Sequence, residues 1–258
     1  MPHAARTRYS RARFKGVMKS MDDLIRTYIG LWSEYTNVRD INIDNLEWKD
    51  EREKLILSFF ARINTLCNDI LILASKKHFT SSDIIMRSAL ESYIDMKCLI
   101  LDTDHVGIIR NAQVKKEIDH LKHYSLDNPY FSYTNQEKVN ASLERLNLEY
   151  DEKLNLKFFK RFEKVDELHA YRTVYNQLCL SSHGNIAALA SNNFDSESGG
   201  IVLESAPKDS TIKFILSSAT SMGIASSVAI MEYFSFNDAK IELFKEIKRR
   251  IDENTRAS

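Results

Sequence analysis

The sequence predicts an all-α protein: an up-and-down helical bundle surrounded by peripheral helices. Two observations support this fold class. The 258 residues include only 7 Gly and 3 Pro, and a fold built on sheets would need more turn residues. Apolar residues also recur at helical spacing through most of the chain. The composition, 43% hydrophobic and 28% charged, is that of a folded globular protein.

The N-terminus is expected to differ from the rest of the chain. We assign residues 1–13 to a flexible basic arm and residues 14–258 to a single helical domain. Six basic residues and no acid precede Asp22. Basic residues without nearby acids can bind the phosphates of a nucleic acid. We therefore take Arg6, Arg8, Arg11 and Arg13 as candidate nucleic-acid-binding residues. Other kinds of N-terminal segment share this composition and remain alternatives. They are a solvated leader, an arm that binds an acidic surface of a partner protein, and a mitochondrial transit peptide.

Three long helices are expected in the first half of the chain, over residues 14–37, 50–78 and 80–102. An acidic linker, residues 38–49, separates the first two. The second and third are joined by a very short turn, so they are expected to pack as an antiparallel hairpin. The third helix starts with the capping-box spacing of Thr80 and Asp83. It is apolar on nearly every side, which is typical of a central helix.

The central helix contains two charges in this apolar setting, Arg87 and Glu91. They lie one turn apart on one side of the helix. Burying a charge is costly unless it is paired, so each must have a partner. We therefore expect them to pair with each other or with another group, and we take both as candidate catalytic residues.

The second half of the chain is expected to contain helices over residues 104–124, 135–152, 165–192, 212–236 and 238–253. The first two are polar, with a turn between them, and the second of them is expected on the outside. A short extended segment is expected near residues 200–206. On the helix at 212–236, Ala219, Gly223 and Ser227 recur every four positions. Such small residues let another helix approach closely, either in the core or across a dimer interface.

A second polar group lies in the segment 165–192. Arg172, Asn176 and His183 are separated by four and seven residues, which places them within about 40° of one another if the helix is continuous. A histidine near a helix C-terminus also has a purely structural explanation, because the helix dipole favours its charge. We take all three as candidate catalytic residues beside the structural alternative.

No metal or cofactor is expected. Glu117, His120 and His123 share a helix face, and their single E-x-x-H is half of a di-iron carboxylate motif, but the sequence has no second copy. A metal or small-ligand site that also uses Glu91 and His183 is the least supported alternative. The cysteines lie in apolar helical runs without ligand spacing, which predicts free thiols in a reducing cytoplasm, at Cys67, Cys98 and Cys179.

Two phrases carry a resemblance to known families. M-R-S-A-L-E, residues 86–91, resembles the R-x-x-L-E helix of bacterial proteins related to the HEPN group, the higher eukaryote and prokaryote nucleotide-binding fold. Y-x-x-x-Y…S-S-H-G, residues 171–184, resembles the second signature of an uncharacterised bacterial family with this architecture. The resemblance spans about residues 50–190. It implies a HEPN-like up-and-down core of four or five helices and frequent dimerisation. It also implies a role as toxin or phage-defence effector, often as a metal-independent ribonuclease.

The ribonuclease motif of the HEPN group, an Arg followed after four to six residues by a His, is absent from this sequence. We therefore expect a HEPN-like protein of a bacterial defence or toxin-type system, with RNA as a candidate ligand and an unconventional site if it is an enzyme. The alternative is a non-catalytic helical interaction module in a larger complex. We further expect a cytoplasmic homodimer that does not bind a membrane. Zero formal net charge gives no independent sign of a polyanionic partner.

Overall fold

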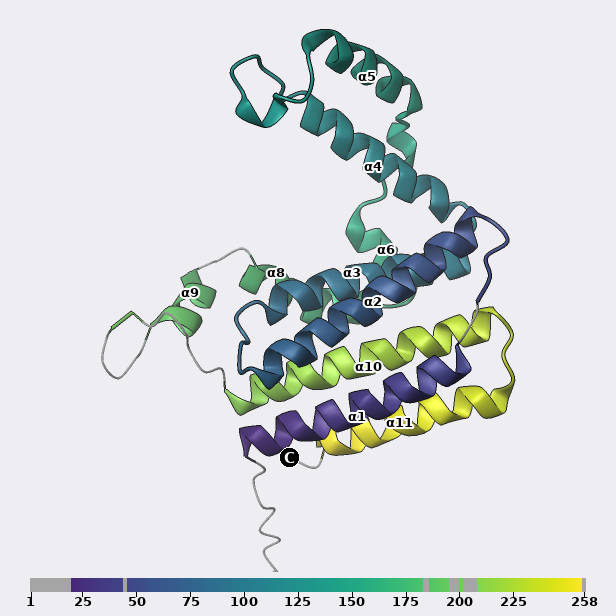
Figure 1. The fold of residues 1–258 in the computed structure, drawn as a ribbon, viewed down its shortest axis with the longest axis vertical. Coiled ribbons are helices and arrows are strands. Elements are labelled where there is room, and N and C mark those ends of the chain that lie inside the picture. Colours follow the sequence, from purple (N-terminus) through teal and green to yellow (C-terminus); the bar gives the residue numbers. More distant parts are fainter. Residues whose placement is uncertain (1–19, 44–45, 183–185, 195–199, 202–207, 257–258) are drawn as a thin grey trace, which may run out of the picture.

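The computed structural model describes residues 20–43, 46–182, 186–194, 200–201 and 208–256. Over these residues the protein is all-helical, as the sequence predicts. Five long helices lie side by side (Figure 1): α1 (Met21–Asn42), α2 (Glu51–Ser75), α3 (Ser82–Leu101), α10 (Asp209–Tyr233) and α11 (Asp238–Arg256). An isolated bridge pairs Phe194 with Ile201, where a short extended segment was expected, and residues 202–207 lie outside the described part.

Helix α1 begins at Ser20, whose hydroxyl accepts from the backbone N–H of Asp23 in a capping box. It continues to Asn42. The expected linker at 38–49 is therefore wrong in its first part, because residues 38–42 extend the helix. Val38 explains this extension, since its side chain packs against the core. Helix α2 follows, with the side chain of Asp50 accepting from Glu53 N–H at its N-terminus.

The expected α2–α3 hairpin is confirmed. Lys77 adopts a left-handed φ of 62° in the short turn between the two helices. The expected capping box at Thr80 is wrong: Ser81 occupies the cap position, and its side chain makes no capping hydrogen bond. Helix α3 packs against α2, α6, α8 and α10, which confirms that it is covered on several sides.

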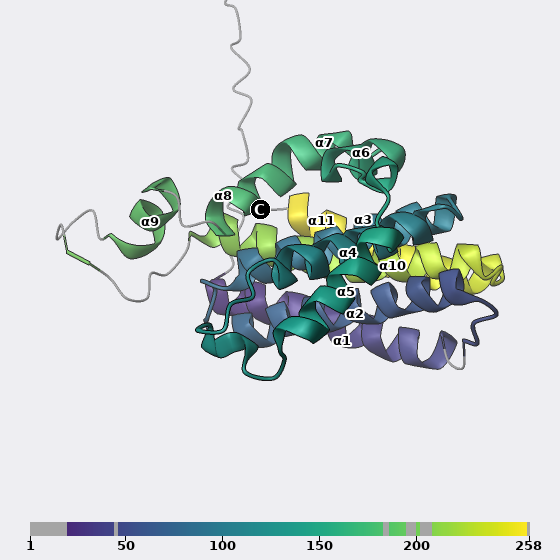
Figure 2. The same cartoon turned by 90° about the horizontal axis from the view of Figure 1, so that it is seen from above.

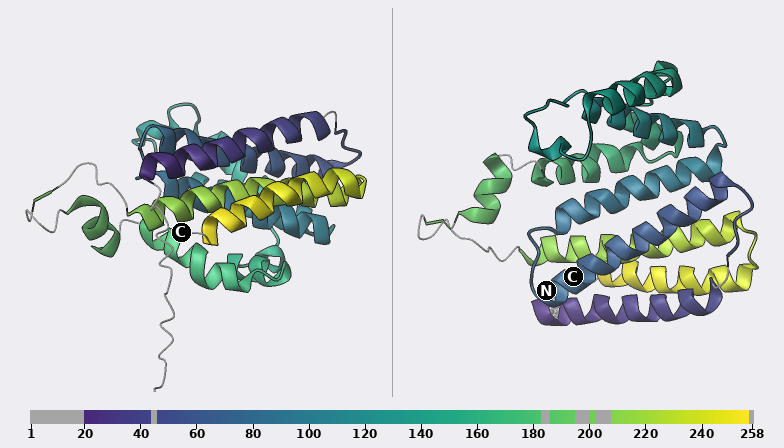
Figure 3. Two further views of the ribbon diagram at one scale, coloured as in Figure 1. Left: turned by 90° about the horizontal axis from the view of Figure 1, so that it is seen from below. Right: turned by 45° about the horizontal axis from the view of Figure 1, so that its top comes forward.

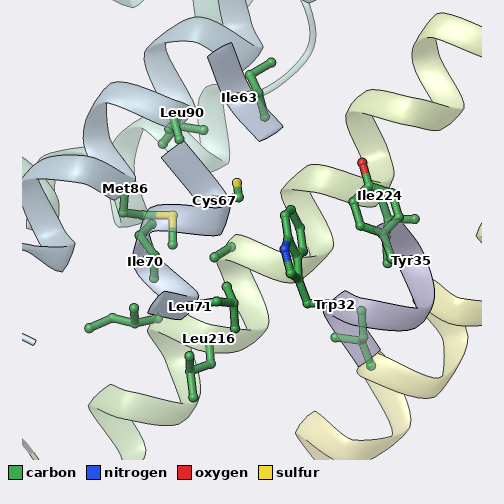
Figure 4. Close-up of a cluster of buried hydrophobic side chains, with 14 of the residues drawn as sticks. Trp32, Tyr35, Ile63, Cys67, Ile70, Leu71, Met86, Leu90, Leu216 and Ile224 are labelled. Atoms are coloured by element: carbon green, nitrogen blue, oxygen red, sulfur yellow. The ribbon is translucent and has the colours of Figure 1, made fainter. Parts of the chain in front are cut away.

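Helix α10 is the most enclosed helix. It packs against α1, α2, α3 and α11, and the small residues predicted to permit close approach are used inside this core. A Cβ atom at Gly223 would lie 2.5 Å from Trp32 Cζ3, so α1 can approach only because a glycine stands there. Figure 4 shows Trp32 and Tyr35 of α1 beside Ile224 of α10.

The core also contains a polar contact between three helices. The buried Tyr35 hydroxyl lies 2.5 Å from Asn64 Oδ1, 2.9 Å from the Gly223 carbonyl and 2.8 Å from Ser227 Oγ. One phenol has a single proton to donate and lone pairs to accept with. Burial raises the pKa of Tyr35, so the hydroxyl keeps that proton and joins α1, α2 and α10 at a fixed register.

Two helices, α2 and α10, are long and apolar enough to span a membrane by length and composition alone. The core helix of a bundle meets the same criteria, and the 18-residue apolar window of α10 is 61% buried inside the protein. The three cysteines are free, as expected. Burial raises the pKa of Cys67 and of Cys98 to about 12, so both are neutral thiols at physiological pH.

Two further parts surround the bundle. Helices α4 (His105–Leu121) and α5 (Gln136–Glu149) form an arm that leans away from it, with the short helix η1 (Pro129–Phe131) at its tip (Figures 1 and 3). The second part follows η2 (Glu152–Leu154) and lies along α3 (Figure 2). It consists of α6 (Phe158–Lys164), α7 (Leu168–Ala170), the π-turn η3 (Tyr171–Tyr175) and α8 (Asn176–Ser182).

The helix expected over 165–192 is thus interrupted. Residues 171–175 form a π-turn rather than an α-helical turn. Residues 183–185 lie outside the described part, and α9 (Ile186–Asn193) follows them. A π-turn inserts one extra residue per turn and so changes which side chains face the neighbouring helix.

Candidate functional site

The charged pair of the central helix has a third member. Arg87 Nε donates to Glu91 Oε1 at 3.0 Å, which confirms that the two residues pair with each other. Tyr175 of the π-turn donates its hydroxyl to the same oxygen, also at 3.0 Å. The Arg87 guanidinium lies 5.5 Å from the centre of the Tyr175 ring, within the range of a cation–π contact. We call these three residues the α3 triad.

The electrostatic environment of the triad determines which of its side chains carry a proton. Burial, and then the negative charge of Glu91, raise the pKa of the Tyr175 phenol, so it remains a neutral donor at pH 7. Burial alone would lower the pKa of Arg87, but Tyr175 and Glu91 outweigh it and raise that pKa. Oε1 of Glu91 therefore accepts two hydrogen bonds, while its Oε2 accepts none from a described residue.

The structure separates the second group of sequence-predicted residues from the first. Tyr175 is buried against α3, whereas Arg172 and Asn176 are exposed on the other side of the segment. Asn176 Nδ2 bonds the Arg172 carbonyl at 3.4 Å, so these two do share a face, but it is not the face that meets Glu91. His183 lies among residues 183–185, outside the described part, as do Arg6, Arg8, Arg11 and Arg13.

A second polar cluster lies one turn further along α3. Asp95 accepts from Arg161 Nη1 of α6 at 2.9 and 3.0 Å, and its Oδ1 lies 3.1 Å from Nε2 of His105, the first residue of α4. The side chains of Asp95 and Arg161 are each 13% exposed, and that of His105 is fully buried. A buried carboxylate with two such partners holds three helices together. We call this the α3–α4–α6 cluster.

Between these two groups lies an open cleft of about 380 Å³. Its floor is α3, with Ser88, Glu91, Ser92 and Asp95, and its sides come from α2, α4 and α6. Three basic side chains line the cleft, one from each of its sides: Arg62 of α2, Lys116 of α4 and Arg161 of α6. Arg161 is paired with Asp95, whereas Arg62 and Lys116 form no ion pair within the described residues.

The cleft can accommodate an anionic ligand. Arg62 Nε bonds Ser92 Oγ at 3.2 Å, which directs the guanidinium along α3 and leaves its remaining N–H groups for other acceptors. Glu91 contributes to the same space a carboxylate whose Oε2 accepts no hydrogen bond from the described residues. A carboxylate beside two cations that have no ion-pair partner in the described part of the chain provides a proton acceptor and two electrostatic stabilisers for a phosphate group.

Sequence reasoning found Arg87 and Glu91 but missed Tyr175, Asp95 and Arg161. One signal was present for Asp95, since it follows Glu91 by four residues and so lies on the same helix face. Tyr175 appears in the sequence as part of the Y-x-x-x-Y signature, and its contact with Glu91 joins residues far apart in the chain. Among the described residues no group of three His, Cys, Asp or Glu side chains is placed to bind a metal.

A protein-family model matches residues 53–201, and that family is described as a family of unknown function (DUF5677). The match covers more than half of the chain. It includes nearly all of α2 and every element from α3 to α9, and with them both polar clusters and the cleft. No curated protein and no solved structure matches the chain.

Proposed function

We propose that this chain, which belongs to a family of unknown function (DUF5677), is a HEPN-like protein that acts on RNA. The geometry of the cleft is the basis of this proposal. The R-x-x-L-E helix that carries the HEPN resemblance is α3, and its Arg and Glu are two members of the α3 triad. A role in a bacterial defence or toxin-type system, in the cytoplasm and as a homodimer, belongs to the same proposal.

One observation carries the assignment. Glu91 has an oxygen that accepts no hydrogen bond from a described residue, and it lines the same cleft as Arg62 and Lys116, which have no ion-pair partner there. Both cations are exposed at the cleft, so a phosphate can bind them without displacing a carboxylate. Unpaired cations around a positioned carboxylate are the arrangement that cleavage of a phosphodiester needs.

The reaction that fits is transfer of the RNA phosphodiester to its own 2′-oxygen. Glu91 accepts the proton of the 2′-OH, the 2′-oxygen attacks phosphorus, and the bond from phosphorus to the 5′-oxygen breaks. Lys116 supplies a proton to the leaving 5′-oxygen, and Arg62 balances the charge on the phosphate oxygens. The products are a 2′,3′-cyclic phosphate and a 5′-hydroxyl, and the atoms and charges balance without a metal ion.

The other members of the triad position the base. Arg87 and Tyr175 hold Oε1 of Glu91, which fixes the carboxylate and directs its second oxygen away from them. Fixing a reacting group in this way avoids reorganisation during the reaction. His183 remains a proposed member of the site. The exposed Arg172 and Asn176 lie on a face turned away from Glu91 and take no part in the proposed chemical step.

The test is cleavage of a panel of RNAs by the full chain in the presence of EDTA. Glu91→Gln keeps the shape of the side chain and removes the proton acceptor, so the rate should fall by about 10²- to 10⁴-fold. The matched control is Arg172→Ala, an exposed change away from the cleft, which should leave the rate within a few-fold of wild type. Equal rates for wild type and Glu91→Gln would contradict the proposal.

The second candidate is the non-catalytic interaction module. It is favoured by the α3–α4–α6 cluster, in which Asp95 bonds both Arg161 and His105 and joins three helices. If the wild-type protein cleaves no RNA in the panel while it binds a protein partner in place of RNA, this candidate replaces the first. The small-residue stripe of α10 is covered by α1, so a dimer interface would use another surface.

A further inference from the structure

The arm formed by α4 and α5 carries aromatic side chains in an unusual setting. Tyr130 is 83% exposed and Tyr133 69% exposed at its tip. Aromatic rings normally bury most of their large apolar area. Tyr133 is nevertheless held in place, because its hydroxyl lies 3.3 Å from His120 Nε2 and its ring stacks on Phe131, with ring centres 6.1 Å apart. The tip therefore presents a fixed ring with a face open to solvent.

The tip is connected to the cleft by a groove between α4 and α5. This groove measures about 330 Å³ and is lined by Gln113, Lys116, His120 and Arg145, among others. Gln113 and Lys116 also line the cleft, so the two hollows share a wall. His120 belongs to the groove and also holds Tyr133. On α4, Gln113, Lys116 and His120 follow one another toward the tip, and each is displaced from the next by about 6 Å or less along the helix axis.

The charges along this path suit a phosphate backbone. Lys116 has no ion-pair partner among the described residues. Arg145 pairs with Glu149 at 2.6 Å on an exposed helix surface, and such pairs contribute little to stability, so a phosphate can compete for the guanidinium. Glu117 is the acid that lines the groove itself. A positively charged groove that leads to open aromatic faces is the pattern of single-stranded nucleic-acid binding, where unstacked bases lie on rings.

We propose that the α4–α5 arm is a binding track for single-stranded RNA that leads from the tip tyrosines into the Glu91 cleft. Phosphates bind Arg145 and Lys116, and bases stack on Tyr133 and Tyr130. This inference rests on the proposed function for its substrate. It adds a surface that lies outside the reacting groups, and it excludes duplex RNA as the preferred ligand, because paired bases cannot stack on side chains.

The test measures binding by fluorescence anisotropy. All binding proteins carry Glu91→Gln so that the probe stays intact, and the probes are a labelled RNA strand of about 12 nucleotides and its duplex. Removal of each tip ring, Tyr130→Ala or Tyr133→Ala, should weaken single-strand binding by about 5- to 150-fold. Leu148→Ala is the matched control: it removes an equally exposed apolar side chain of the same arm that has no aromatic face.

The outcomes separate this inference from the proposed function. Weaker binding in both tyrosine variants, with Leu148→Ala unchanged and the duplex bound less tightly, supports the track. If the tyrosine variants bind as the control does while Glu91→Gln abolishes cleavage, the track is overturned and the ribonuclease stands. If they lose binding but the wild type cleaves nothing, the track stands alone. Absence of RNA binding from about 50 to 200 mM salt overturns it and assigns the tip to a protein partner.

Discussion

Replacing Asp95 by Asn tests the buried α3–α4–α6 cluster directly. The change keeps the size of the side chain but removes the charge that faces Arg161 and His105. Nδ1 of His105 and Nε of Arg161 already lack hydrogen-bond partners among the described residues, so Asp95 is the main compensation for burying both. Breaking a buried pair costs about 3–5 kcal/mol. Since Asp95 and Arg161 retain 13% exposure, we expect about 3 kcal/mol, at the lower end.

The assay is urea unfolding followed by circular dichroism at 222 nm, a wavelength that reports helix. With a urea dependence of about 3 kcal/mol per molar for a chain of this size, the midpoint should fall by about 1 M. The control is Asp119→Asn on α4, where an exposed carboxylate pairs with Lys115 at 2.7 Å. That surface pair is worth less than about 1 kcal/mol. If the two variants unfold at the same midpoint, the buried-cluster reasoning is refuted.

Two further stability predictions follow from local geometry. Gly223→Ala places a Cβ against the Trp32 ring and should destabilise the protein by about 1–2 kcal/mol after the gain in helix propensity. At Gly30 an added Cβ meets nothing within 4 Å, so Gly30→Ala should stabilise the protein by up to about 1 kcal/mol. Both changes are measured from the urea midpoints. The hydrogen bond from Lys164 lowers the pKa of Asp102 below 3.8, so its stabilisation is full above that pH and is lost as pH falls through the folded value. Asp102→Asn should therefore flatten the loss of stability below about pH 4, and an unchanged acid limb would contradict this assignment.

The sequence predicted the fold from features that are local. The short connection after Ser75 forces α2 and α3 into a hairpin, and the spacing of small residues marks the close contact at Gly223. The boundaries that failed depended on tertiary contacts. Residues 38–42 look like a linker by their charge, yet they remain helical because Val38 packs on the core. The propensity of a short polar segment is too weak to oppose such packing.

The site was predictable only in part, for a related reason. Arg87 and Glu91 stand out because charges on an apolar helix need partners, and one turn separates them. Tyr175 reaches Glu91 across 84 positions of sequence, and Arg161 reaches Asp95 across 66. No local pattern encodes such pairings. Arg172 and Asn176 share a face as their spacing predicts, but that face is turned to solvent.

The measurement that tests the central claim most directly is the chemical identity of the RNA ends after incubation with the wild-type protein. If Glu91 activates the 2′-OH, the fragments carry 2′,3′-cyclic phosphate and 5′-hydroxyl ends, they form in EDTA, and RNA with 2′-deoxy substitution at the cleavage site is resistant. Fragments with 3′-hydroxyl and 5′-phosphate ends that require a divalent metal would contradict the account, because a different nucleophile would then have attacked the phosphate.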